Sequence, residues 1–135
     1  MANGKYIIFD GMDGSGKGTQ INLLRNKLNG VVFTHEPGGT PFAEEIRKTV
    51  RDNPFAGEST PLNNFLLFWA AREELVNRLV TPALFSDKHV FSDRGDSSTF
   101  ALQIYGEQSH ELMDLFSRIR EAVFETQERR APDMY

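Results

Sequence analysis

The feature that most constrains this chain is a glycine-rich segment, residues 9–20, which reads Phe-Asp-Gly-Met-Asp-Gly-Ser-Gly-Lys-Gly-Thr-Gln. It follows a short apolar stretch and precedes an amphipathic one, which is the order of a strand, a loop and a helix. Glycines let the backbone curl so that successive N–H groups face a phosphate, while the helix N-terminus and Lys17 add positive charge. The segment therefore predicts a phosphate-binding loop for a nucleoside triphosphate.

This loop departs from the common phosphate-loop motif at one position. The motif G-x-x-x-x-G-K-[ST] places Ser or Thr after the lysine, whereas this chain has Gly18, and Thr19 is the nearest hydroxyl. The departure weakens the case for direct hydroxyl ligation of Mg²⁺. A dinucleotide-binding motif, G-x-G-x-x-G, fails because Thr19 stands at its third glycine position. A glycine-rich turn with a chance lysine is disfavoured by the strand before it and the helix after it.

Length and composition predict one domain, residues 1–135, that acts on a small anionic ligand. The hydrophobic fraction is 39%, with 11 Phe, which is enough for a core. The net charge of −4 argues against a nucleic-acid partner. Cysteine is absent, which excludes disulfides and thiolate metal sites, and the N-terminal residues lack an apolar run of signal or membrane-span length. We expect a cytoplasmic protein with no membrane partner.

The hydrophobic pattern predicts an α/β fold in which helices cover a parallel sheet. Apolar runs predict strands at residues 6–9, 31–33 and 90–92, and residues 129–135 look like the approach to another strand. Helical spacing predicts helices at 20–29, from Thr40-Pro41 to Val50, at 60–80, at 99–105 and at 111–127, with a loop at 51–60. The helix at 60–80 is apolar over most of its circumference, so we expect it to be buried between layers.

Further clusters fall where these strands end, which is where open parallel sheets bind ligands. They are residues 34–40 (Thr-His-Glu-Pro-Gly-Gly-Thr), residues 68–72 (Phe-Trp-Ala-Ala-Arg), and Asp93-Arg94 with Ser98 and Gln103. With the glycine loop, these motifs span most of the chain and resemble those of the thymidylate kinase family. Members of that family are P-loop nucleoside monophosphate kinases that phosphorylate dTMP with ATP and Mg²⁺. The resemblance implies a three-layer P-loop NTPase fold and ATP and dTMP as partners.

The resemblance also implies a role for each residue of these motifs. The ATP-binding residues would be Gly11, Met12, Asp13, Gly14, Ser15, Gly16, Lys17, Gly18 and Thr19. The dTMP-binding residues would be Asp13, Glu36, Arg47, Phe68, Arg72, Arg94, Ser98 and Gln103. Lys17, Arg94 and Asp13 would be catalytic, and Asp93 would bind Mg²⁺, usually through water.

The residue chemistry agrees with these roles but leaves alternatives open. Guanidinium groups match phosphate oxygens, which suits Arg94 and Arg47, although Arg47 could instead pair with Glu44 or another neighbour on its own helix. Asp13 beside polyphosphate is repelled unless something bonds to it, and in the family this carboxylate accepts a hydrogen bond from the 3′-hydroxyl of the acceptor. Its alternative is a solvated turn residue, and for Asp93 the alternative is a cap for the following turn.

Phe68 and Arg72 lie four positions apart, so they share one helix face and can meet one ligand. By the resemblance, Phe68 stacks on thymine and Arg72 donates to its O4, while Gln103 completes the base edge. Without the resemblance, Phe68 would be assigned to the core. His35 stands where the family more often has Arg, and we assign it no catalytic role.

Several positions depart from the family pattern. Gly95 replaces an aromatic or imidazole residue, and Leu102 replaces an aromatic residue that crowds the 2′ position of the sugar. Gly14 stands where one subgroup has a catalytic arginine, so this chain resembles the subgroup that keeps that arginine in a lid. The family continues past the equivalent of Pro132-Asp133 into that lid, so we expect these residues alone to turn over slowly.

We also expect a homodimer through the helices that flank the sheet. The alternatives that remain are a kinase for another nucleoside monophosphate and a nucleotide-binding module without turnover, and Gly-Lys-Gly-Thr-Gln also occurs in adenylate kinases.

Overall fold

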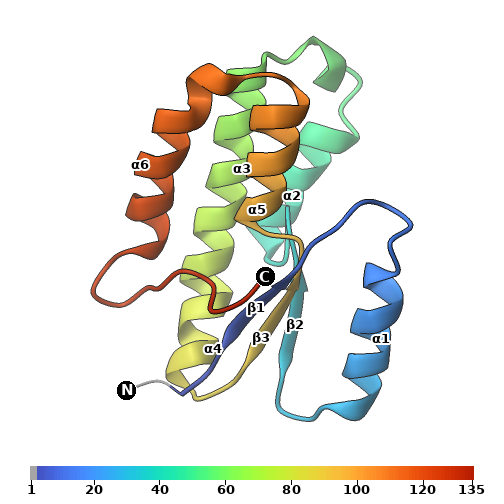
Figure 1. Cartoon of the computed structure of the whole chain (residues 1–135), viewed down its shortest axis with the longest axis vertical. Helices are drawn as coiled ribbons and strands as arrows, with labels where there is room; N and C mark the ends of the chain where they lie inside the picture. The colour runs from blue at the N-terminus through green and yellow to red at the C-terminus, as the bar shows by residue number, and fades with distance from the viewer. Residues whose placement is uncertain (1–2) are drawn as a thin grey trace.

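In the computed structural model, which describes residues 3–135, three parallel strands form one sheet (Figure 1). The strands are β1 (Tyr6–Phe9), β2 (Val32–His35) and β3 (Val90–Asp93), in the order β1-β3-β2. Val90 is in register with Tyr6 on one side and with Val32 on the other. The predicted strands are confirmed, and the last in sequence occupies the middle of the sheet.

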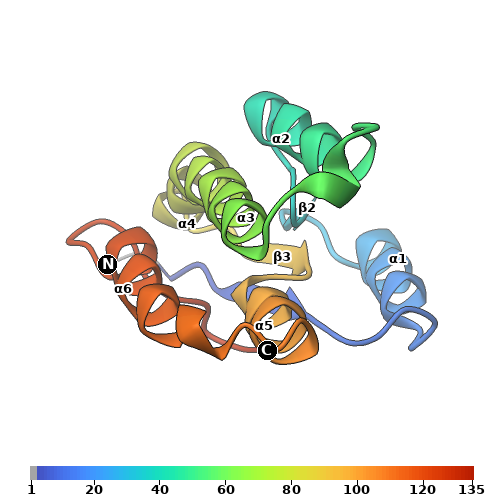
Figure 2. The same cartoon turned by 90° about the horizontal axis from the view of Figure 1, so that it is seen from above.

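Helices cover both faces of this sheet and give the three layers of a P-loop NTPase fold. They are α1 (Lys17–Lys27), α2 (Pro41–Arg51), the 3₁₀ turn η1 (Ala56–Glu58), α3 (Pro61–Leu75), the π-helical turn η2 (Val76–Val80), α4 (Thr81–Phe85), α5 (Asp96–Ser98), the π-helical segment η3 (Thr99–Gly106), the 3₁₀ turn η4 (His110–Leu112) and α6 (Met113–Phe124). In Figure 2, α3, α4 and α6 lie on one side of the sheet and α1 lies on the other.

The predicted helix starts at the two Thr-Pro pairs are confirmed. The Thr40 hydroxyl accepts a hydrogen bond from the Ala43 N–H at 3.3 Å, and the Thr60 hydroxyl accepts one from the Asn63 N–H at 3.2 Å. The helix predicted at 20–29 begins earlier, at Lys17, because Gly16 caps it. The helix predicted to end near residue 80 continues through η2 into α4.

The expectation that α3 is buried between layers is confirmed for one side of the helix only. Phe65, Trp69 and Leu75 are buried in the core, but Leu62 and Leu66 are 46% and 45% exposed. Among residues 3–135, no layer covers this face of the helix fully, so part of its apolar surface is exposed.

The core lies where α3 and α6 meet the sheet and is built around Trp69. The Trp69 ring makes edge contacts with Phe65, Phe116 and Phe124 at centroid distances of 6.3, 5.4 and 6.3 Å. These rings join the inward side chains of β1 and β3, so one continuous core supports the strand ends.

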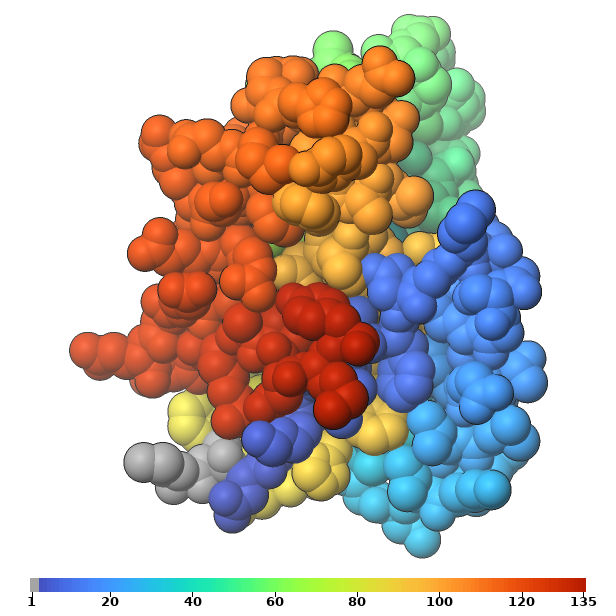
Figure 3. All heavy atoms as spheres, viewed as in Figure 1, coloured from blue at the N-terminus to red at the C-terminus, as the bar shows by residue number. Residues whose placement is uncertain are grey.

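The C-terminal segment, residues 130–135, packs along β1, as the dark red and dark blue surfaces of Figure 3 show. The Asp133 carboxylate accepts hydrogen bonds from the Tyr6 N–H at 2.9 Å and the Lys5 ammonium at 3.1 Å. The Ile8 N–H donates to the Met134 carbonyl at 2.9 Å, and Ile7 forms a parallel bridge with Met134. The predicted approach to a further strand is thus confirmed.

Within residues 3–135, no helix combines the length and apolarity needed to cross a bilayer. The expectation that the N-terminus carries no apolar leader rests partly on Met1 and Ala2, which lie outside the described residues.

Candidate functional site

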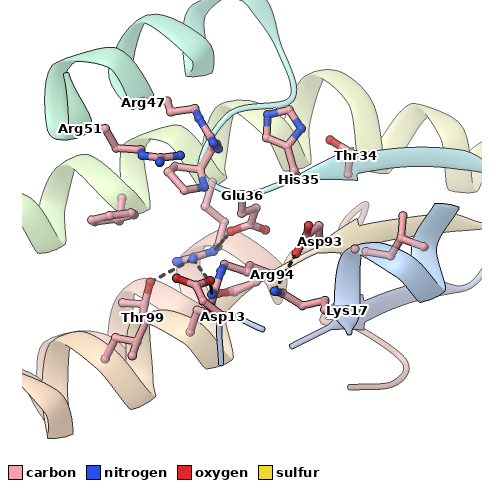
Figure 4. Close-up of a pocket in the computed structure, with 18 of the residues that line it drawn as sticks. Asp13, Lys17, Thr34, His35, Glu36, Arg47, Arg51, Asp93, Arg94 and Thr99 are labelled. Carbon is pink, nitrogen blue, oxygen red and sulfur yellow. Dashed lines mark hydrogen bonds and ion pairs between the residues drawn. The ribbon is translucent and has the colours of Figure 1, made fainter. Parts of the chain in front are cut away.

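The segments that follow the three strands meet at one edge of the sheet. The Arg94 N–H donates to the Phe9 carbonyl at 2.8 Å, and the Glu36 N–H donates to the Asp93 carbonyl at 2.9 Å. These bonds tie the ends of β1, β2 and β3 together, as expected for parallel strands that all run one way. A cavity of about 810 Å³ opens at this edge, between α1, α2, α3 and η3 (Figure 4).

The glycine loop leads from β1 into the N-terminus of α1. Gly14 and Gly16 have φ angles of +81° and +90°, a left-handed conformation that other residues rarely adopt. Gly16 is the N-cap of α1, and among the described residues no side chain caps the N–H groups that follow it. These N–H groups are therefore available to an anion. Lys17 lines the cavity, and its ammonium lies 3.7 Å from an Asp93 carboxylate oxygen.

Asp13 and Arg94 pair across the cavity floor. The Arg94 Nη2 group donates to Asp13 Oδ1 at 2.9 Å, and Nη1 donates to the Ser98 hydroxyl at 3.0 Å. The pairing explains how a carboxylate is tolerated in this loop, since Arg94 offsets its charge. Arg94 itself has a φ of +71°, a conformation that turns the chain sharply after β3.

Asp10 is a site residue that sequence reasoning missed. It accepts hydrogen bonds from the Ser98 hydroxyl at 2.8 Å and from the Ser97 hydroxyl, and Arg94 Nη1 lies 3.5 Å away. It therefore joins the glycine loop to the start of α5. Its place at the end of a buried strand, directly before the glycines, is the signal that could have found it.

Asp93 has the properties of a sparse Mg²⁺ ligand. Its Oδ1 atom is buried and has no hydrogen-bond donor within the part of the chain that the structure describes. No group of three or more metal-ligating side chains occurs among residues 3–135. A single carboxylate beside a phosphate loop fits Mg²⁺, which keeps most of its waters and takes its remaining ligands from phosphate. An all-protein metal cage does not fit.

Arg47 lies across the cavity from Arg94, on α2 (Figure 4). Its Nη1 group donates to the Pro37 carbonyl at 2.8 Å, and it makes no ion pair with Glu44. Glu44 instead accepts hydrogen bonds from the Gly39 N–H at 2.8 Å and from His35 at 2.6 Å. The Gly39 N–H, then His35 and the charge of Arg47, lower the pKa of Glu44 against the effect of burial. Arg47 thus acts on Glu44 only at a distance, and the alternative of a direct Arg47–Glu44 ion pair is not found.

Further cationic side chains line the cavity that sequence reasoning did not assign. Arg51 lies one turn beyond Arg47 on α2, and Arg25 lies on the facing side of α1. The sequence does not indicate that these two arginines belong to the site, because only the packing of α1 and α2 brings them to one cavity.

The predicted base-binding residues Phe68, Arg72 and Gln103 all line the same cavity. Arg72 is 2% exposed and lies over the Trp69 ring, with its guanidinium carbon 4.4 Å from the ring centroid. Its Nη1 atom is buried without a hydrogen-bond partner among residues 3–135, as are both amide atoms of Gln103. Buried polar atoms are normally bonded, so these atoms point to a polar ligand.

Glu36 holds Arg72 in place. Arg72 Nε donates to Glu36 Oε2 at 2.6 Å, and the Tyr6 hydroxyl donates to Glu36 Oε1 at 3.1 Å. Burial raises the pKa of Glu36, and the neighbouring Arg72 opposes that rise. Each carboxylate oxygen is bonded within the protein, so a direct contact of Glu36 with substrate stays a prediction. Leu102, the departure noted at the sugar position, lines the cavity and is 55% exposed.

A parallel sheet with a phosphate loop after its first strand and a ligand cavity at its strand ends defines a P-loop nucleotide-binding protein. Within this class, the thymidylate kinase family model matches residues 9–135, and the chain belongs to that family.

Relatives of known sequence and structure agree with this assignment. The chain is 48% identical over 107 residues to the thymidylate kinase of Pelotomaculum thermopropionicum, covering 76% of this chain and 49% of that protein. It is 44% identical over 104 residues to the thymidylate kinase of Chlorobaculum tepidum, covering 74% and 48%. The crystal structure of thymidylate kinase from Ehrlichia chaffeensis superimposes with a TM-score of 0.83 at 34% identity, over 97% of this chain and 73% of that one. The chain spans about half the length of the curated relatives it matches.

Proposed function

We propose that this protein phosphorylates dTMP with ATP to give dTDP. The observation that carries the proposal is that two kinds of side chain line the same cavity. Cationic groups, Lys17 and Arg94 among them, gather beside the glycine loop. An aromatic ring and unbonded polar atoms, from Phe68 and Gln103, lie toward α3 and η3. A nucleotide presents this combination of a charged phosphate and a flat, polar-edged base.

Phosphoryl transfer in this cavity rests on positioning and charge, with no covalent intermediate. We assign the ATP phosphates to the glycine loop, where backbone N–H groups and Lys17 face them. Arg94 and Arg47 approach the acceptor phosphate from opposite walls and counter its charge. Asp13, whose charge Arg94 offsets, accepts a hydrogen bond from the 3′-hydroxyl of the acceptor. The two phosphates are thereby aligned for direct displacement.

Mg²⁺ belongs to this proposal as a partner of ATP. Asp93 would hold it, chiefly through water, at the buried oxygen that lacks a donor in the described chain. Bound there, Mg²⁺ supplies positive charge to the transferred phosphate. Lys17, 3.7 Å from the same carboxylate, orients Asp93 and counters its charge.

Calorimetric titration of the chain tests the proposed acceptor. We expect dTMP to bind more tightly than dCMP, because Arg72 Nη1 can donate to a thymine carbonyl but not to the amino group of cytosine.

Arg94→Gln should weaken dTMP binding by about tenfold or more and leave thymidine binding almost unchanged, since a charged hydrogen bond to phosphate is lost. Arg118→Gln, at an exposed position on α6 paired with Asp114, is the matched control. Equal binding of dTMP and dCMP would indicate that the acceptor is another nucleoside monophosphate. Binding of ATP without dTMP would indicate a nucleotide-binding module without kinase activity.

We further propose a homodimer that works in the cytoplasm. The absence of cysteine agrees with a compartment in which disulfides do not form. Phe42 on α2 is 64% exposed, and Leu62 and Leu66 on α3 are exposed as well. A second copy of the chain would cover these side chains.

Light scattering at micromolar concentration is the measurement for the dimer. Leu66→Glu should convert the dimer to a monomer, because it places a charge in an apolar interface. Leu23→Glu, at an exposed leucine of α1, should not. A wild-type chain that is monomeric throughout would contradict the proposal.

A further inference from the structure

We propose that Tyr6, in the first strand, is a positioning residue for the nucleotide base. Its buried hydroxyl holds Glu36, and Glu36 in turn holds Arg72 at the cavity wall. The inference rests on the proposed function, because that function assigns Arg72 to the base of dTMP.

The three side chains form a continuous buried chain of contacts. Tyr6 is 0% exposed, and its hydroxyl donates to Glu36 Oε1 at 3.1 Å. The other oxygen, Oε2, accepts from Arg72 Nε at 2.6 Å. The carboxylate is therefore held from both sides, by β1 and by α3, and it cannot rotate without losing one of its two donors.

The contacts of Arg72 leave one group for a ligand. Besides the Nε bond, its Nη2 group donates to the Gly95 carbonyl at 3.1 Å and to the Thr99 hydroxyl at 3.0 Å. Because a guanidinium is planar, fixing Nε and Nη2 also fixes Nη1. Nη1 is the group without a partner in the described residues, so the direction in which Arg72 can donate depends on the Glu36 contact.

The hydroxyl at this position is not needed for core packing, since a phenylalanine ring would fill nearly the same space. A buried tyrosine hydroxyl instead needs an acceptor, and Glu36 provides it. Burial, and then the Glu36 charge, raise the pKa of Tyr6 well above its ordinary value, so the hydroxyl stays a donor in the working pH range.

Tyr6→Phe tests the inference, with dTMP and ATP titrated by calorimetry. We expect dTMP affinity to fall about 3- to 10-fold, from the loss of one buried hydrogen bond to a charged group. ATP affinity should stay unchanged. A residue that only stabilised the fold would not lower the affinity for dTMP alone.

Tyr135→Phe is the matched control. It removes a hydroxyl that also donates to a carboxylate, Asp96 Oδ1 at 2.9 Å, but outside the cavity. We expect dTMP affinity in this variant to equal that of the wild type. A loss of the same size in both variants would contradict a specific role for Tyr6.

A second measurement does not depend on dTMP. The Nε–H proton of Arg72 should exchange slowly with solvent in the wild type and faster in Tyr6→Phe, as read by NMR. Unchanged Nε–H exchange and unchanged dTMP affinity would overturn the inference. A wild type that does not prefer dTMP would contradict the proposed function instead, and the Nε–H signal would still decide whether Tyr6 positions Arg72.

Discussion

At the scale of single residues, the cavity depends on a few buried or constrained positions. Lys17 is the one ammonium among the described residues that lines it, and its side chain is 10% exposed. Arg72 cannot be tested by simple removal, because Arg72→Ala would leave Glu36 buried without its charged partner and destabilise the fold. Informative substitutions at this scale remove one contact and keep the rest.

Lys17→Ala should reduce ATP binding below detection by calorimetry while the protein stays folded. The substitution removes a charged hydrogen bond to phosphate, which is worth about 1.5–3 kcal/mol or more where water is excluded. Lys27→Ala, at the other end of the same helix, should leave ATP binding intact. Unchanged ATP affinity in a folded Lys17→Ala protein would contradict the assignment of the glycine loop.

Gly95→Ala should destabilise the protein by about 1–3 kcal/mol through overpacking. A Cβ atom at Gly95 would lie 2.1 Å from Cδ1 of the buried Ile8 side chain. This close contact also explains why glycine, and not a ring, follows Arg94 in this chain. Chemical denaturation measures the effect, and Gly57→Ala, where an added Cβ meets no atom within 4 Å, should be nearly neutral. Equal stability of the two variants would refute the steric argument.

At the scale of elements, capping and terminal contacts hold the segments that carry the site. α2 begins at Pro41, and its N-cap Thr40 follows the loop that contains Glu36 and Pro37, so the cap also sets where Arg47 enters the cavity. The C-terminal segment binds to β1 through Asp133, and β1 leads at its other end into the phosphate loop. Stability at these two places is therefore coupled to the geometry of the cavity.

Thr40→Ala should lower the free energy of unfolding by about 1 kcal/mol, the usual cost of a lost helix cap. The hydroxyl that accepts from the Ala43 N–H is removed, and that N–H is then left unbonded in a buried place. Thr40→Ser keeps the hydroxyl and should recover most of the loss. Urea denaturation of both variants is the measurement, and an equal loss in the serine variant would assign the effect to packing.

The C-terminal segment should detach from β1 in acid. Burial alone would raise the pKa of Asp133, but the Tyr6 N–H, Lys5 and Arg130 outweigh it and lower the pKa below the ordinary value. A carboxyl group with a lowered folded-state pKa stabilises the fold above its unfolded pKa, and the contribution is lost as the pH falls through the folded value. The pH window therefore lies below about pH 4.

Hydrogen exchange of the Ile8 N–H, which donates to the Met134 carbonyl, measures this detachment. In the wild type its protection should fall below that pH before protection in α3 does. In Asp133→Asn it should be low already at neutral pH, whereas Glu45→Gln, on the exposed face of α2, should behave as the wild type. Protection that falls equally in all elements would indicate global unfolding instead.

At the scale of the whole molecule, sequence reasoning succeeded where a local pattern decides the structure. Apolar runs, Thr-Pro pairs and glycine spacing gave the strands, the helix starts and the loop, because each depends on neighbouring residues. It failed for the exposed side of α3, because Leu62 and Leu66 look the same whether one chain or a second copy covers them. Arg25 and Arg51 were missed since their place in the cavity depends on how α1 and α2 pack.

Prediction of the site likewise succeeded for local motifs and failed for contacts between distant residues. The motif residues Lys17, Arg72 and Arg94 were found, and all line one cavity. Their partners within the protein were not found, because a tyrosine in a strand reads as core and nothing local links Tyr6 to Glu36, 30 positions away.

The central place of β3 has a consequence for synthesis of the protein on the ribosome. β1 and β2 contact β3 and not each other. A nascent chain that ends before Val90 therefore has a complete glycine loop but no neighbour for either strand, and its apolar strand residues stay exposed. The sheet can form only after the last of its three strands has been made, which requires closure of two long chain segments at once. Until then a chaperone has two unpaired strands to protect.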